Sequence, residues 1–121
     1  MSNFPTDMKK QSDTFLHEKE LPWEFPAAGV RRQILGYDDR LMIVKVEFEQ
    51  GSDGGGRHTH PHSQSCLIVS GRFEVTVDGK TEALGAGDGF YVAPDVLHGV
   101  ICLEPGTVLD AFSPMREEFL K

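Results

Sequence analysis

The chain is organised around the stretch His58-Thr59-His60-Pro61-His62-Ser63-Gln64, which holds three of the protein's five histidines. His58 and His60 are two residues apart, so on an extended strand both imidazoles project from the same face. Two imidazoles placed in this way can share one metal ion, at roughly 2.0–2.1 Å from each nitrogen. A His-rich surface loop would show the same residues, so the interpretation depends on what the rest of the chain supplies.

The regions on both sides have the pattern of short β-strands separated by turns. Apolar side chains at 42, 44, 46 and 48 alternate with others, which is the period of a half-buried strand. Asp78-Gly79 is a preferred pair for a two-residue hairpin turn. The expected strands cover residues 42–49, 66–69, 72–77, 81–84, 90–92, 98–103 and 107–112. Strands this short and this regularly spaced indicate an antiparallel barrel or sandwich, so the predicted fold class is all-β.

We expect a single domain, because 121 residues can bury a core but do not require a second one. Residues 1–28 are predicted to form an N-terminal arm and residues 29–121 the strands with a short C-terminal helix or tail. Pro22 and Pro26 exclude a regular helix in the arm and disfavour an interior strand. Trp23 and Phe25 are expected to pack on this subunit or on a neighbour.

Composition narrows the classes of function. Hydrophobic residues make up 39% of the chain and charged residues 26%, as in soluble globular proteins. No apolar run approaches the ~18 residues of a membrane span, and no secretory signal is visible, so we expect a cytoplasmic protein without a membrane partner. The net charge of −7 argues against a nucleic-acid partner and makes an anionic substrate dependent on local cations.

The two cysteines do not form a metal-type or redox-type pair. Cys66 and Cys102 are expected to be reduced thiols that pack inside the barrel, although the sequence leaves a bridge between them open. His62 follows Pro61 and is expected to be a turn residue whose ring bonds the backbone or a neighbouring carboxylate. His17 is expected to be a solvated residue of the arm.

Two spaced motifs carry a resemblance to a known family. His58-x-His60-x3-Gln64-x6-Gly71 resembles the first cupin motif, which usually has Glu where Gln64 stands, and Gly87-x6-Pro94-x3-His98-x3-Cys102 resembles the second. The resemblance implies a small single-domain cupin, that is, a double-stranded β-helix or jelly-roll barrel. By the same resemblance, one divalent metal ion is bound by His58, His60, Gln64 and His98. An inactive scaffold is the alternative, because some cupins have lost their metal.

The chemistry of this ligand set can be argued from its donors. Three neutral imidazoles and one neutral amide oxygen leave the full +2 charge of the ion uncompensated, so the site should act as a Lewis acid and attract an anionic substrate. Mixed nitrogen and oxygen ligation suits Ni, Zn, Fe or Mn, and the sequence does not choose among them.

The similarity continues beyond the ligands. Four stretches resemble the pectin-degradation cupins of the KdgF type, and together they span roughly residues 28–120: Arg32–Tyr37, His58–Gln64, Val92–Val100 and Asp110–Glu117. This group opens the ring of 4,5-unsaturated galacturonate or mannuronate monomers to give linear 4-deoxy-5-hexosulose uronate. The resemblance therefore implies a small anionic sugar as substrate, and it also implies a homodimer. Ser63, where a carboxylate is common, and the longer arm depart from the group.

Three C-terminal residues match positions implicated in the activity of that group. Asp110 suits general acid/base catalysis, and Arg116 suits bidentate binding of a substrate carboxylate. Phe112 shares a strand face with Asp110 and can shape the sugar pocket. A cupin dioxygenase and a non-catalytic sugar- or metal-binding cupin are the alternatives, and loss of the substrate's double-bond absorbance would separate them from the first interpretation.

Overall fold

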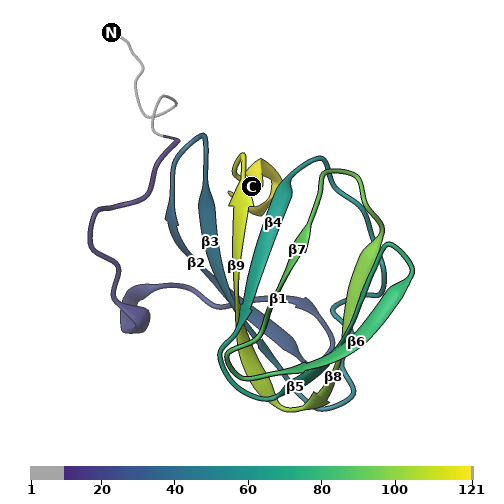
Figure 1. Ribbon diagram of the computed structural model, residues 1–121. Helices are drawn as coiled ribbons and strands as arrows, with labels where there is room; N and C mark the ends of the chain where they lie inside the picture. The colour runs from purple at the N-terminus through teal and green to yellow at the C-terminus, as the bar shows by residue number, and fades with distance from the viewer. Residues whose placement is uncertain (1–9, 121) are drawn as a thin grey trace, which may run out of the picture.

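The computed structural model describes residues 10–120, which form two antiparallel sheets (Figure 1). The larger sheet has the order β1-β2-β3-β9-β4-β7 and the smaller one the order β6-β5-β8. The strands are β1 Glu24–Ala27, β2 Val30–Tyr37, β3 Met42–Phe48, β4 Ser63–Ile68, β5 Arg72–Val77, β6 Lys80–Gly85, β7 Gly89–Val92, β8 His98–Glu104 and β9 Gly106–Ser113. The predicted all-β fold is confirmed, with the sheets crossing over as in a jelly roll.

Strand β3 shows why the alternating pattern folds in this way. Met42, Val44, Val46 and Phe48 are buried, while the residues between them are only partly so. The apolar side chains thus line the inside of the barrel, and the predicted alternation is confirmed, with the strand ending one residue before the expected bound. The core also takes in side chains of β5, β8 and β9, including Phe73, which meets the Phe48 ring edge-on with the centroids 5.2 Å apart.

The central position of β9 in the larger sheet sets the geometry of the later site. Its neighbours are β3 on one side and β4 on the other. Asp110 lies opposite Cys66 of β4, and Phe112 lies opposite Gln64. Side chains from two strands distant in sequence therefore share one inward-facing patch.

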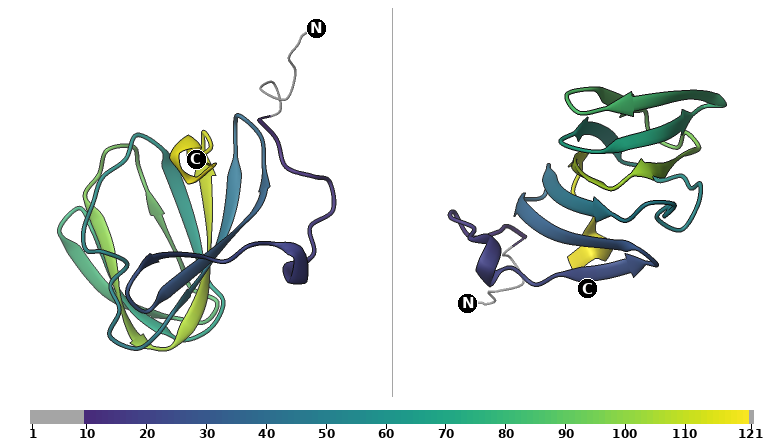
Figure 2. Two further views of the ribbon diagram at one scale, coloured as in Figure 1. Left: turned by 180° about the vertical axis from the view of Figure 1, so that it is seen from behind. Right: turned by 90° about the horizontal axis from the view of Figure 1, so that it is seen from below.

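The expected hairpin turn at Asp78-Gly79 connects β5 and β6. Asp78 has φ +53° and Gly79 has φ +80°, so both central residues are in the left-handed region, as a type I′ turn requires. Strands β6 to β9 extend one residue beyond an expected bound at one or both ends, and β4 begins three residues early, at Ser63, and ends one residue early, at Ile68. The C-terminal segment forms the 3₁₀ helix η3, Glu117–Leu120, at one end of the barrel (Figures 1 and 2).

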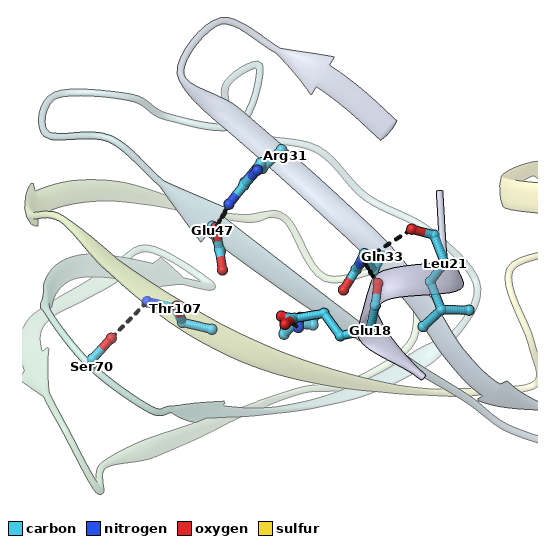
Figure 3. Close-up of polar contacts among 8 residues, drawn as sticks. Glu18, Leu21, Arg31, Gln33, Glu47, Ser70 and Thr107 are labelled. Carbon is cyan, nitrogen blue, oxygen red and sulfur yellow. Dashed lines mark hydrogen bonds and ion pairs between the residues drawn. The ribbon is translucent and has the colours of Figure 1, made fainter. Parts of the chain in front are cut away.

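The described part of the arm runs beside the outer face of the larger sheet (Figure 2). Its 3₁₀ helix η2, Glu18–Glu20, is fastened by the fully buried Gln33, whose Nε2 donates to the carbonyls of Glu18 and Leu21 at 3.1 Å each (Figure 3). Trp23 packs on its own chain, with the Arg31 guanidinium 3.8 Å from its ring centre. The arm is thus held by buried contacts of β2.

Phe25 is 74% exposed, so of the two expected alternatives it does not pack on its own subunit, and packing on a neighbour stays a prediction. Residues 1–9 of the predicted arm lie outside the described residues. The division at residue 28 stays a prediction. Strand β1 shows that the end of the arm joins the larger sheet as an edge strand. Pro26 is tolerated there, because an edge strand can lack a backbone N–H without breaking a hydrogen bond inside the sheet.

Both cysteines are buried and free, so they pack as reduced thiols and no bridge joins them. Among residues 10–120, no helix has the length and apolar character needed to cross a membrane.

Candidate metal centre

Three histidines from two distant segments converge at one end of the barrel. His58 and His98 form an isolated bridge in which each backbone N–H donates to the other's carbonyl, at 2.9 and 3.0 Å. The His60 ring lies beside them, with its centroid 4.7 Å from that of His98. One nitrogen from each ring falls within 4.8 Å of the others. The expected convergence of these three predicted ligands is therefore present.

Backbone carbonyls orient all three rings. The Nδ1 of His98 lies 2.8 Å from the Val96 carbonyl oxygen, that of His60 lies 3.1 Å from His62 O, and that of His58 lies 3.2 Å from Gly56 O. A carbonyl only accepts, so each Nδ1 carries the proton and each Nε2 presents a lone pair. Histidine metal ligands usually donate their other ring N–H to a backbone carbonyl in this way.

Gln64 completes the donor set. Its Nε2 donates to Asp110 Oδ1 at 2.9 Å, so its Oε1 faces His60 Nε2 at 3.0 Å. Both of these facing atoms are acceptors when the imidazole is neutral, and burial lowers the pKa of His60 and so favours that neutral form. Two acceptors turned toward each other need a shared cation, which a bound metal ion would supply.

A further buried atom fits the same ion. His98 Nε2 is buried and has no hydrogen-bond partner in the described chain, and burial also lowers the pKa of His98. An orphaned buried acceptor is costly unless it is ligated. The residues present therefore fit a divalent metal ion, bound through three imidazole nitrogens and one amide oxygen.

Asp110 is the acidic group beside this centre. Burial raises its pKa, while hydrogen bonds from Gln64 and Cys66 and the charge of Arg116 act in the opposite direction. Burial and the neighbouring Asp110 carboxylate raise the pKa of the Cys66 thiol, which keeps it protonated as a donor. Asp110 is thus a buried carboxyl group whose pKa is raised and which is hydrogen-bonded beside the histidines, and such a group suits proton transfer.

A cavity of about 340 Å³ opens next to the histidines. Six of the predicted site residues line it: His58, Gln64, His98, Asp110, Phe112 and Arg116. Phe112 is 5% exposed and meets the His60 ring edge-on, with the centroids 5.6 Å apart. The structure brings the predicted ligands and the predicted C-terminal residues into one site, and their individual roles stay predictions.

Arg116 is placed at this cavity by the turn into η3. Its guanidinium carbon lies 5.1 Å from the centre of the Phe112 ring and 4.4 Å from that of Phe119, and its Nε donates to Glu118 at 2.7 Å. The side chain is 14% exposed. Its Nε contact and its two ring contacts therefore hold it in a fixed orientation at the cavity.

His62 lies in the bend that contains Pro61, as expected, but the surroundings of its ring differ from the expectation. The residue is buried, and its Nδ1 has no hydrogen-bond partner within residues 10–120. Its ring instead packs edge-on against His60 at 5.4 Å and near Phe112 at 6.4 Å. His62 supports the ligand ring by packing, because the turn after Pro61 directs it inward.

Sequence reasoning missed three residues at the cavity. Cys66 donates to Asp110, Phe119 carries the Arg116 guanidinium, and Arg32 of β2 lines the same cavity. The contact of Cys66 with Asp110 joins strands distant in sequence, and no local signal reveals it, whereas Phe119 lies only three residues after Arg116. Arg32 did leave a signal, because it stands at an inward position of β2 between Val30 and Ile34.

The chain is similar in sequence to a known family and to a known protein. Residues 44–112 match the cupin domain family. The chain is 38% identical over 104 residues to pectin degradation protein KdgF of Dickeya dadantii (strain 3937), a match that covers 85% of this chain and 94% of the relative.

Two solved structures are similar throughout. A RmlC-like cupin from Shewanella frigidimarina NCIMB 400 has a TM-score of 0.87 and 43% identity, covering 91% of this chain and 98% of the other. KdgF from Halomonas sp. has a TM-score of 0.83 and 35% identity, covering 88% and 99%.

Proposed function

Because this chain belongs to the cupin domain family and, within it, to the family of pectin degradation protein KdgF, we propose that it opens the ring of 4,5-unsaturated uronate monosaccharides in a metal-dependent reaction. The product is the linear 4-deoxy-5-hexosulose uronate. The observation that carries the proposal is the contact of Asp110 with Gln64, which joins a proton-transfer group to a metal-ligand residue inside one cavity.

The substrate class explains why these groups are needed together. An unsaturated uronate is a cyclic enol ether with a carboxylate and a hemiacetal hydroxyl. Opening its ring takes the proton from the anomeric hydroxyl, breaks the bond between C1 and the ring oxygen, and delivers a proton to C4 of the resulting enol. The aldehyde at C1 and the ketone at C5 are then both formed without any net gain or loss of atoms.

The residues of this chain can perform these proton movements. Asp110 accepts and donates protons at its carboxyl oxygens, and its raised pKa places the neutral form within reach. Arg116 offers its terminal N–H groups to the substrate carboxylate in a charge-assisted contact. Phe112 forms an apolar wall that excludes water from the reacting atoms. A divalent metal ion held by His58, His60, Gln64 and His98 would supply Lewis acidity toward a substrate oxygen.

The test is an assay of purified unsaturated uronate monomer with protein in three states: as isolated, stripped by a chelator, and reloaded with single divalent metals. We expect the double-bond absorbance to fall, the fall to depend on metal, and the keto-aldehyde product to appear in stoichiometric amount. Oxygen consumption during turnover would instead indicate a cupin dioxygenase. Binding of the sugar without turnover under every metal would indicate a non-catalytic cupin.

A further inference from the structure

Two arginines, not one, face the cavity. Arg32 of β2 and Arg116 before η3 both line it, and both guanidiniums lie over the ring of Phe119, at 3.8 and 4.4 Å from the ring centre. The two guanidinium carbons therefore lie no farther apart than the sum of these two distances, a span that one ligand carboxylate at the edge of the ring could bridge. Phe119 therefore acts as a shared platform for two cations.

Each of these arginines is oriented in the same manner. Arg32 Nε donates to Glu24 Oε1 at 2.8 Å, and Arg116 Nε donates to Glu118 Oε2 at 2.7 Å. A guanidinium has five N–H donors in a rigid fork. The Nε contact uses one of them, and the other four are on the two terminal nitrogens. Both side chains are mostly buried, with exposed fractions of 20% and 14%.

The inward position of Arg32 is not explained by a purely structural role, that is, by an ion pair that only ties neighbouring strands together. The neighbouring inward positions of β2 are apolar, and a charged side chain among them is costly unless it is fully paired. The same strand already has such a structural ion pair on its outer face. Arg31 stacks on Trp23 at 3.8 Å and pairs with Glu47 at 2.8 Å, and the Arg31–Glu47 pair is visible in Figure 3.

We propose that Arg32 is a substrate-binding residue, which forms with Arg116 a two-guanidinium subsite for the carboxylate of a uronate. The two forks grip the carboxylate oxygens at the end of the cavity that Phe119 closes, and they orient the sugar ring toward the histidines and Asp110. This inference rests on the proposed function only in taking the ligand to be a uronate.

Calorimetry on the metal-loaded full chain tests the subsite without turnover. The probes are galacturonate and its uncharged methyl ester, which both lack the double bond that the reaction needs. We expect wild type to prefer the acid and Arg32→Met to bind the acid about 10- to 100-fold more weakly, with little loss for the ester. Arg32→Lys should recover only part of the affinity, because a point charge lacks the planar fork.

Arg31→Met is the matched control. It removes an arginine with the same aromatic and carboxylate contacts from the same strand, and we expect wild-type binding. Glu24→Gln is the second control. It breaks the ion pair that ties β1 to β2 but keeps the guanidinium, so it should retain most of the preference for the acid.

The outcomes separate this inference from the proposed function. An acid preference that depends on Arg32 in a protein without ring-opening activity would sustain the subsite and reject the function. Ring opening with an unchanged KM in Arg32→Met would support the function and reject the subsite. The subsite is also rejected if wild type does not prefer the acid, if Arg32→Met binds like Arg31→Met, or if Glu24→Gln reproduces the whole loss.

Discussion

At the scale of single residues, the side-chain amide of Gln64 links the candidate metal centre to Asp110, the residue proposed to transfer protons. Gln64 presents Oε1 to the histidine cluster and Nε2 to Asp110. A carboxylate in this position could serve the metal but could not donate to Asp110. The amide therefore performs two tasks that the more usual cupin Glu cannot combine.

The first prediction follows from this double contact. Gln64→Glu should retain metal, because a carboxylate is also a good ligand, but turnover should fall. The new charge neutralises part of the cation's charge and faces Asp110, and two carboxylates at hydrogen-bond distance do not both ionise. Steady-state kinetics with metal content measured on the same sample is the check. Ser65→Glu, which adds the same charge at an exposed position of β4, should leave turnover intact. Full activity in Gln64→Glu would show that the neutral ligand is incidental.

The second prediction concerns Asp110. Asp110→Asn should lower kcat by about 10²- to 10⁴-fold with little change in substrate binding, because the group moves protons rather than anchoring the sugar. An asparagine oxygen can still accept the hydrogen bond from Gln64, so the fold and the metal site should survive. Equal kcat values for variant and wild type, at equal metal occupancy, would remove Asp110 from the mechanism.

The same substitution should also affect stability. Burial raises the Asp110 pKa above its ordinary value of 3.8, so the folded state holds a proton that the unfolded chain has already lost. Wild type therefore loses stability as the pH rises from about this value through the raised pKa, and the asparagine variant does not. In metal-free protein, we expect urea unfolding to show a stability advantage for Asp110→Asn that grows from acid to neutral pH. A constant difference across this range would contradict the prediction.

At the scale of elements, the crossing of the segment 56–58 over β8 positions the first ligand. Gly99 lies directly below it, and a Cβ there would meet Arg57 Cγ at 3.0 Å and its Cα at 3.2 Å. His58 and His98 are joined by backbone hydrogen bonds across this crossing. Any outward shift of the segment therefore moves the His58 ring relative to the His98 ring.

The third prediction uses this contact. Gly99→Ala should push the segment outward by a few tenths of an ångström and weaken metal binding by roughly 10-fold, as changes next to metal ligands do. Gly79→Ala is the control. Gly79 has φ +80° and open space around a Cβ, so its substitution should cost about 1–2 kcal/mol of stability and leave metal affinity unchanged. Competition with a chromophoric chelator measures the affinity, and equal affinities in the two variants would contradict the argument.

At the scale of the whole molecule, metal binding and folding are linked. The ligands belong to a preorganised site that the unfolded chain lacks, so the ion should stabilise the native state. At free metal about 100 times the Kd the gain is about 2.7 kcal/mol, or roughly 10 °C in Tm for a chain of this length. The fourth prediction is that chelation lowers Tm by about this amount and that added metal restores it. Differential scanning calorimetry is the measurement, and an unchanged Tm after verified metal removal would contradict it.

The fifth prediction gives the pH dependence of the metal-free protein. Burial lowers the pKa of both His60 and His98 below the ordinary value of 6.5. As the pH falls below about 6.5, the unfolded chain takes up protons first, so stability is lost until the folded-state pKa values are passed. Asp110 acts in the opposite sense, so the measurement belongs in the Asp110→Asn background. A stability that does not decline with acidification there would show that these rings are not held neutral by burial.

The sequence alone predicted most of the strands and named the residues that could bind metal. Period-two alternation records which face of a strand is buried, and the Asp78-Gly79 pair records a turn with two positive φ values, so β3 and the β5–β6 hairpin could be read locally. The histidines and Gln64 named from the two motifs also come together in the structure, although His58 lies in an isolated bridge and His60 lies outside any strand.

Only the tertiary structure decided what surrounds those residues. The burial of His62, the exposure of Phe25, the bond from Cys66 to Asp110 and the stacking of Arg32 on Phe119 all depend on which strands become neighbours and in what register. These contacts join residues that are far apart in the chain, so no local pattern encodes them. The physical reason is that a side chain's own sequence neighbourhood sets its face, whereas its partners are set by the closure of the barrel.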